Sequence, residues 1–278
     1  MKYHIHLFLL FLICGISLPS LSGLLVFPFS IVPNELILAY VIILSFVFLL
    51  SSILLRSRES LKDYWQVFFA FFIASLAIFF DFLINIPSET MNGIVLDMLV
   101  STSIIVSTVI LLTRISGIAL SSIFLKKGNI RLGIIVGLTG FFIFASTSIP
   151  AAEYLFQGQH LNLEKVTVWM PWIMPIVLLN GVREEILYRG LFLKRFEAEL
   201  GSKTSNLLQA IIFSLSHSVA GVGPSAYTPF IWVLVLFTFS LGLAWGYIMQ
   251  RTDSILGSIL FHAGTDIPVF IGVFSNIF

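Results

Sequence analysis

Three short stretches of this sequence place acid–base side chains inside strongly apolar segments. They are EEILYR at 184–189, FSLSH at 213–217 and HAGTD at 262–266. A carboxylate such as Glu184 can remove a proton from water, and histidines such as His217 and His262 exchange protons near neutral pH. Ionisable groups inside membrane spans are costly and usually functional. Together these side chains have the chemistry needed to activate a water molecule.

The spacing within the first stretch separates its two glutamates. Residues four apart share one face of a helix, so Glu185 and Arg189 can form a buried ion pair. Glu184 lies about 100° away around the same helix, on the face of Asn180. We therefore expect Glu185, Arg189 and Asn180 to support the site, and Glu184 to carry the chemistry.

The other two stretches also place their side chains in pairs. Phe213 and His217 share one helix face, with Phe213 in a supporting role, and His262 and Asp266 share another. At 1.5 Å of rise per residue, Glu184, His217 and His262 lie roughly 14–18 Å from the cytoplasmic ends of their predicted helices. That depth is near the middle of a ~30 Å hydrocarbon core. We expect the three to converge in one site that opens to the cytoplasm.

The chain as a whole is too apolar for a soluble protein. Of its 278 residues, 58% are hydrophobic and 10% are charged, whereas soluble domains carry about 25% charged residues. Much of the chain must therefore have the bilayer as its solvent. The net charge of +1 gives no reason to expect a nucleic-acid partner. Cys14 is the only cysteine, which excludes an internal disulfide and a cysteine-based metal cluster.

Nine segments are apolar enough to span a membrane, for which a helix needs ~20 mostly apolar residues. They are 5–27, 36–55, 65–86, 93–112, 131–149, 167–190, 204–220, 228–249 and 254–277. The start of the chain also resembles a signal peptide, and removal of residues 1–22 would leave eight spans. We favour an uncleaved first span.

Basic residues concentrate in alternate loops, which sets the orientation of the spans. These loops are 56–64, 113–131, 191–203 and 250–253. Because loops rich in Lys and Arg remain in the cytoplasm, we expect the N-terminus to be cytoplasmic. The heavy use of Phe and Ile is typical of an AT-rich genome and so points to a bacterium. We therefore expect a multi-pass protein of a bacterial plasma membrane.

The three stretches resemble the motifs of the CPBP intramembrane proteases, also called CAAX-processing or Abi-type proteases. EEILYR resembles the family's EExxxR, FSLSH its FxxxH, and HAGTD its HxxxN/D. They occur in the family's order and on separate predicted spans. The resemblance covers about residues 165–270 and implies an intramembrane endopeptidase. Its substrate would be a peptide or protein in or at the lipid bilayer, of a membrane-associated or prenylated type.

The fold class predicted is all-α, a polytopic membrane helical bundle of 8–9 transmembrane helices. Residues 1–130 should form N-terminal accessory transmembrane helices. Residues 131–278 should form the CPBP-type catalytic helical core.

The resemblance also implies roles for individual side chains. Glu184 and His217 would polarise a water molecule, with Glu184 as general base, and His262 with its i+4 partner would stabilise the oxyanion. That partner is Asp266 here, and an ionised aspartate cannot donate a hydrogen bond. Asp266 is therefore either protonated or orients His262 by accepting its ring N–H, and we prefer the second.

A metal site is an open alternative. Glu184, His217 and His262 could bind a catalytic zinc ion as a His₂Glu set with an open fourth position. Asp266 would then orient His262 from outside the ligand set. There is no HExxH motif. The sequence does not separate metal-bound water from water activated by Glu184 and His217.

Two other classes of function stay open. A proton-coupled transporter would also use carboxylates and histidines inside the membrane, although no internal repeat is evident. A non-catalytic membrane scaffold or bacteriocin-immunity protein could retain the motifs, because motifs do not prove turnover. A scaffold should keep its function with Glu184→Gln, and a protease should lose it.

Overall fold

The computed structural model describes residues 2–18, 34–155, 158, 160–217 and 230–278, and none of these residues lies in a β-strand. The chain divides into two compact units. Unit 1 comprises Met1–Ile84, Ile104–Leu125 and Ile186–Tyr247, and unit 2 comprises Asn85–Ser103, Lys126–Glu185 and Ile248–Phe278. The predicted division of the chain near residue 130 stays a prediction.

Unit 1 is held together by stacked phenylalanines and by polar side chains between helices. Its helices are α1 (Lys2–Ser17), α3 (Asn34–Arg56), η1 (Glu59–Tyr64), α4 (Trp65–Phe82), η2 (Leu120–Ile123), α9 (Leu191–Leu200), α10 (Ser202–Ser216), and parts of α5 (Met91–Ile115) and α11 (Phe230–Thr252). Phe196 of α9 stacks on Phe11 of α1 with ring centroids 5.4 Å apart, and Phe71 of α4 lies 4.9 Å from Phe192. Gln209 of α10 donates hydrogen bonds to the carbonyl of Gly242 in α11, at 3.0 Å, and to Asn206. Such interhelical hydrogen bonds stabilise helix pairs where water is absent.

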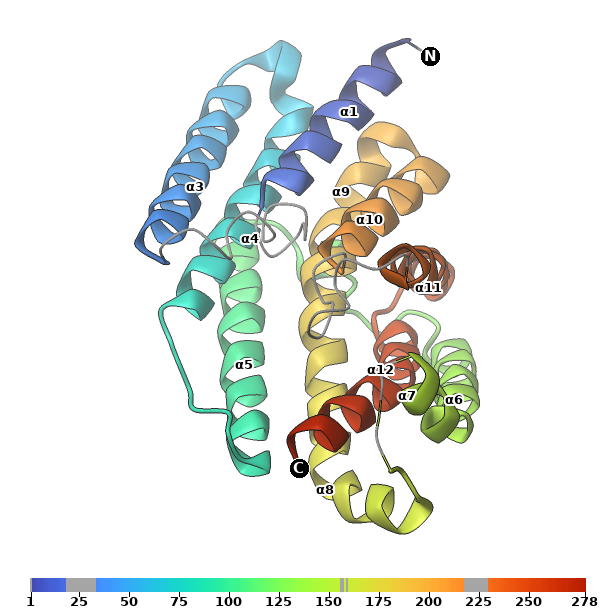
Figure 1. Cartoon of the computed structure of the whole chain (residues 1–278). Coiled ribbons are helices and arrows are strands. Elements are labelled where there is room, and N and C mark those ends of the chain that lie inside the picture. Colours follow the sequence, from blue (N-terminus) through green and yellow to red (C-terminus); the bar gives the residue numbers. More distant parts are fainter. Residues whose placement is uncertain (1, 19–33, 156–157, 159, 218–229) are drawn as a thin grey trace. The chain divides into compact units, whose positions relative to one another are not determined.

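Unit 2 is built around its last helix. Its helices are α6 (Ile130–Ser146), α7 (Ser148–Leu155), α8 (Leu163–Glu184), α12 (Leu256–Ile277), the first part of α5 and the end of α11. In Figure 1, α12 (red) lies against α6, α7 and α8.

Glycines let the helices of unit 2 approach closely, as is usual between membrane helices. A Cβ atom added at Gly137 of α6 would lie 2.8 Å from the carbonyl oxygen of Gly257 in α12. One added at Gly181 of α8 would lie 3.0 Å from the carbonyl oxygen of Ile259. Gly181 therefore lets α8 approach α12 in the turn that precedes His262.

Six described helices are long and apolar enough to cross a membrane. They are Glu35–Arg56, Glu59–Phe82, Met91–Ile115, Leu163–Leu200, Trp232–Thr252 and Leu256–Ile277. The pair Ile130–Ser146 and Ser148–Tyr154 is bent by 59° and counts as a seventh if it forms one span. Among the described residues, the predicted all-helical architecture with several candidate membrane spans is thereby confirmed.

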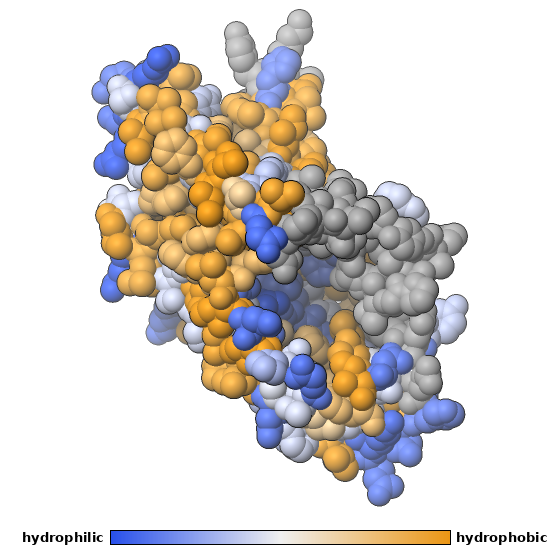
Figure 2. Space-filling view, turned by 60° about the vertical axis from the view of Figure 1, so that its left-hand side comes forward, coloured by the Kyte–Doolittle hydropathy of each residue, from blue (hydrophilic) through white to orange (hydrophobic). Residues whose placement is uncertain are grey.

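The exact number of spans stays a prediction. The predicted spans 5–27 and 204–220 overlap the shorter helices α1 and α10. Each of these two predicted spans also includes residues outside the described part of the chain. Large apolar side chains are exposed on the long helices; on α3, for example, Phe46 is 65% exposed and Ile43 is 61% exposed. Figure 2 shows apolar side chains over much of the visible face, as expected where lipid rather than water surrounds the helices.

Candidate functional site

The backbone changes character at the EEILYR stretch. The α-helix α8 ends at Glu184, and a π-helical turn, η3, runs over Glu185–Gly190 before α9 begins. Single π-helical turns inside helices are rare and are frequent at functional sites. The turn begins directly after the glutamate for which the sequence predicts the chemistry.

His262 of α12 lies at the centre of a cluster of carboxylates in unit 2. Its Nδ1 is 2.8 Å from Oε1 of Glu185, and the two side chains are 2% and 0% exposed. Its Nε2 is 3.5 Å from Oε2 of Glu184 and 3.6 Å from Oδ1 of Asp266. An ionised carboxylate can only accept a hydrogen bond, so Nδ1 carries a proton and points it at Glu185. Nε2 is the ring atom that faces Glu184 and Asp266.

Asp266 is connected to α8 through an amide. Asn180 donates a hydrogen bond from Nδ2 to Oδ2 of Asp266 at 2.8 Å. The oxygen of the same amide accepts a hydrogen bond from Nη2 of Arg183 at 2.6 Å. Nη1 of Arg183 donates to Oγ of Ser101 on α5 at 3.0 Å. The motif residues of α8 and α12 therefore share one polar network, which extends to α5.

His217 and Phe213 belong to unit 1 and lie at the end of α10. Nδ1 of His217 is 2.9 Å from the carbonyl oxygen of Phe213, and the two ring centroids are 4.4 Å apart. A carbonyl only accepts hydrogen bonds, so Nδ1 is the donor and the lone pair of a neutral ring is on Nε2. His217 is thus held in the tautomer that can accept a proton or bind a metal through Nε2. His217 and Glu184 belong to different units, and each unit is described by itself. The convergence of these two side chains in one site therefore stays a prediction.

Arg189 is buried among aromatic rings in unit 1. Its side chain is 0% exposed, and its guanidinium carbon lies 3.9 Å from the ring centroid of Phe213 and 5.0 Å from that of Trp245. A guanidinium over aromatic faces is stabilised by the negative charge density of the rings. The predicted pair of Glu185 and Arg189 stays a prediction, because the boundary between the units falls after Glu185.

Among the described side chains, no group of three or more His, Cys, Asp or Glu residues is placed to hold a metal ion. The predicted zinc set takes Glu184 and His262 from unit 2 and His217 from unit 1. Zinc binding stays a prediction, and the chemistry below is derived from the side chains alone.

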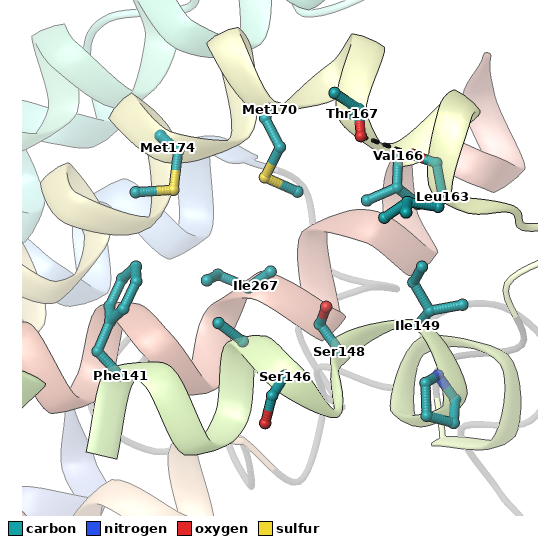
Figure 3. A pocket seen from close by; sticks show the side chains of 12 residues that line it. Phe141, Ser146, Ser148, Ile149, Leu163, Val166, Thr167, Met170, Met174 and Ile267 are labelled. Atoms are coloured by element: carbon teal, nitrogen blue, oxygen red, sulfur yellow. Dashed lines mark hydrogen bonds between the residues drawn. The ribbon is translucent and has the colours of Figure 1, made fainter. Parts of the chain in front are cut away.

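Unit 2 also contains an apolar pocket of about 540 Å³. In Figure 3, Met170 and Met174 point from α8 toward Phe141 of α6 and Ile267 of α12. Ile267 directly follows Asp266 on α12, but no residue of the polar network lines the pocket. Methionine side chains adapt to irregular apolar partners. The first half of α8, which lines this pocket, lies toward the outside in the predicted orientation. The opening of the site to the cytoplasm stays a prediction.

Sequence reasoning missed two residues and one contact at this site. Arg183 and Ser101 belong to the network, and Glu185 contacts His262 directly. The signal for Arg183 was present, since it adds a third charge at the end of an apolar span. No comparable signal existed for Ser101, which is 82 residues from its partner and is a common type of helix-packing residue.

The comparison with known proteins agrees with the motifs. Residues 166–268 match the model of the family described as type II CAAX prenyl endopeptidase Rce1-like. This segment contains all three stretches, and the match supports the resemblance to the CAAX-processing intramembrane proteases. The match implies a CAAX-type protease in general terms. No curated protein and no solved structure matches the chain significantly.

Proposed function

We propose that this protein is an intramembrane endopeptidase that hydrolyses a peptide bond of a membrane-associated or prenylated-type substrate. The observation that carries the proposal is the buried His262, whose ring nitrogens face carboxylates of both the EEILYR and the HAGTD stretches. The family match over residues 166–268 supports the same class of enzyme. The proposal includes eight or nine spans, a cytoplasmic N-terminus and a bacterial plasma membrane.

In the proposed reaction, Glu184 acts as general base. It takes a proton from a water molecule while the water oxygen forms a bond to the carbonyl carbon of the scissile peptide. The carbonyl oxygen becomes an oxyanion, toward which a protonated Nε2 of His262 can donate a hydrogen bond. When the C–N bond breaks, Glu184 returns its proton to the departing amine. The products are a carboxylic acid and an amine, which exchange a proton to give a carboxylate and an ammonium group, and no further reactant is needed.

The remaining residues prepare this step. Glu185 would fix the ring of His262 from the Nδ1 side, and Asp266, which faces the same ring from the Nε2 side, would help to orient it. His217, held through Nδ1, would help Glu184 polarise the water through Nε2. If zinc binds instead, Glu184, His217 and His262 would hold it, and it would make the bound water more acidic.

Cleavage of defined substrates tests the proposal. The purified protein is incubated with a farnesylated CAAX peptide and with a library of unmodified membrane peptides. Glu184→Gln should lower cleavage by about 100-fold or more, because general bases contribute about 10²–10⁴-fold. Glu164→Gln, at an exposed position in the first turn of the same helix, is the matched control and should cleave normally.

The same assay separates the other classes of function. A scaffold, an immunity protein or a transporter would give no cleavage by the folded wild type. Equal cleavage by wild type and Glu184→Gln would overturn the assigned role of Glu184. Cleavage of only the farnesylated peptide would narrow the substrate class to prenylated chains.

A further inference from the structure

Arg183 is a charged residue of the site that lies outside all three motifs. It precedes Glu184 on α8, and its side chain is 23% exposed. One guanidinium nitrogen donates to Ser101 at 3.0 Å, and the other donates to Asn180 at 2.6 Å. The second nitrogen also lies 3.7 Å from Oε1 of Glu184. A planar guanidinium can serve several acceptors at once in this way.

Arg183 determines which way the amide of Asn180 points. The amide oxygen faces the guanidinium and the amide nitrogen faces Asp266. If the amide turned over, its N–H groups would face the donors of Arg183 and its oxygen would face the carboxylate of Asp266. Both hydrogen bonds would then be lost, since a donor would face a donor and an acceptor an acceptor. The observed arrangement holds a donor against Asp266.

Charge gives Arg183 a second role. Glu184, Glu185 and Asp266 are three carboxylates around one imidazole, and two of them face its Nε2. Carboxylates close together at low dielectric repel one another strongly. The guanidinium of Arg183 is next to Glu184 directly and is linked to Asp266 through one amide.

We propose that Arg183 is a positioning residue that holds Asn180 and Asp266 in place against His262 and offsets the negative charge of the site. This inference rests on the proposed function and adds a residue to it. It also explains how this chain accommodates an aspartate at position 266, where the family pattern allows the neutral asparagine. Asp266→Asn should make Arg183 much less important, because the neutral side chain no longer needs a compensating cation.

A double-mutant cycle tests the proposal, because it measures coupling between two residues rather than the effect of each. Arg183→Gln in the wild-type background should lower kcat/KM by about 10-fold or more, mainly through kcat. In the Asp266→Asn background the same substitution should cost less than about 3-fold. Arg183→Lys should recover part of the loss. Equal costs in both backgrounds would show that Arg183 has only a local structural role.

Thermal unfolding of the same four proteins in detergent keeps the test independent of activity. Arg183→Gln should lower Tm by about 3 °C or more, since 1 kcal/mol shifts Tm by about 2–4 °C in chains of 150–250 residues. Asp266→Asn should remove most of that shift, and an unchanged shift would overturn the proposal. This result stands even if the wild type cleaves no peptide, so the failure of the proposed function and the failure of this inference are distinguishable.

The second anchor of Arg183 supplies a matched pair of variants. Ser101→Ala removes the hydrogen bond to Nη1 and should lower kcat several-fold. Ser103→Ala, two residues along the same helix, removes only a hydrogen bond to the helix's own backbone at Leu99 and should leave kcat unchanged. Equal rates for these two variants would contradict a role for Ser101 in holding Arg183.

Discussion

Glu185→Gln removes the negative charge beside Nδ1 of His262 and keeps the shape of the side chain. The two atoms are 2.8 Å apart and both residues are buried, so the contact is a charge-assisted hydrogen bond shielded from water. Hydrogen bonds to charged groups contribute about 1.5–3 kcal/mol and neutral ones about 1 kcal/mol. The substitution should therefore weaken the positioning of His262 by about 0.5–2 kcal/mol, which corresponds to about 2–30-fold in kcat/KM.

The comparison with Glu184→Gln makes this prediction specific. Loss of the general base should cost about 10²–10⁴-fold, so Glu185→Gln should retain at least several times more activity than Glu184→Gln. Both variants are assayed on one fluorogenic peptide, and thermal unfolding confirms that each is folded. If Glu185→Gln is folded and as inactive as Glu184→Gln, the reasoning is refuted and Glu185 is a candidate for the base. If it matches wild type, the contact with Nδ1 does not orient His262.

Three further predictions concern the scaffold and are measured by thermal unfolding in detergent. Gly137→Ala should destabilise the protein by about 1–3 kcal/mol, because its Cβ would press on the α12 backbone. Gly133→Ala, whose nearest contact would be 3.5 Å, should be neutral or stabilising, and equal effects would contradict the packing of α6 on α12. Arg189→Ala should cost at least about 2 kcal/mol, since it removes a buried cation from two aromatic rings; an unchanged Tm would argue against that contact. Gly128→Ala should cost about 2 kcal/mol or more, because φ is +49° and the added carbon would lie 2.5 Å from the carbonyl oxygen of Asp253; a tolerated alanine would rule out this backbone conformation.

The membrane architecture could be predicted because it follows from composition along the chain. Long apolar windows identify spans without knowledge of their partners, and six such windows are long apolar helices in the structure. The break at Thr147 between α6 and α7 was not predicted. The bend falls at the polar residues 146–148, just before Pro150, but a hydropathy window of about 20 residues averages over so short an interruption. The π-helical turn at Glu185–Gly190 was likewise invisible, since no residue type specifies it.

The residue types of the site could be predicted from the sequence, but the contacts between helices could not. Spacing on one helix relates residues four apart, and this places His262 with Asp266 and His217 with Phe213. Contacts between helices depend on rotation and on small residues such as Gly181, which a single sequence does not reveal. For this reason Glu185 could be matched with Arg189 from spacing, whereas its 2.8 Å contact with His262 required the structure.

The central claim is that Glu184 activates the water that cleaves the peptide. The most direct measurement is peptide cleavage by purified wild type and Glu184→Gln in detergent, each with and without a zinc chelator. Wild type is expected to cleave in both conditions, and Glu184→Gln in neither. Loss of wild-type activity on chelation, restored by zinc, would assign the water to a metal ion instead. Undiminished cleavage by Glu184→Gln would contradict the account itself.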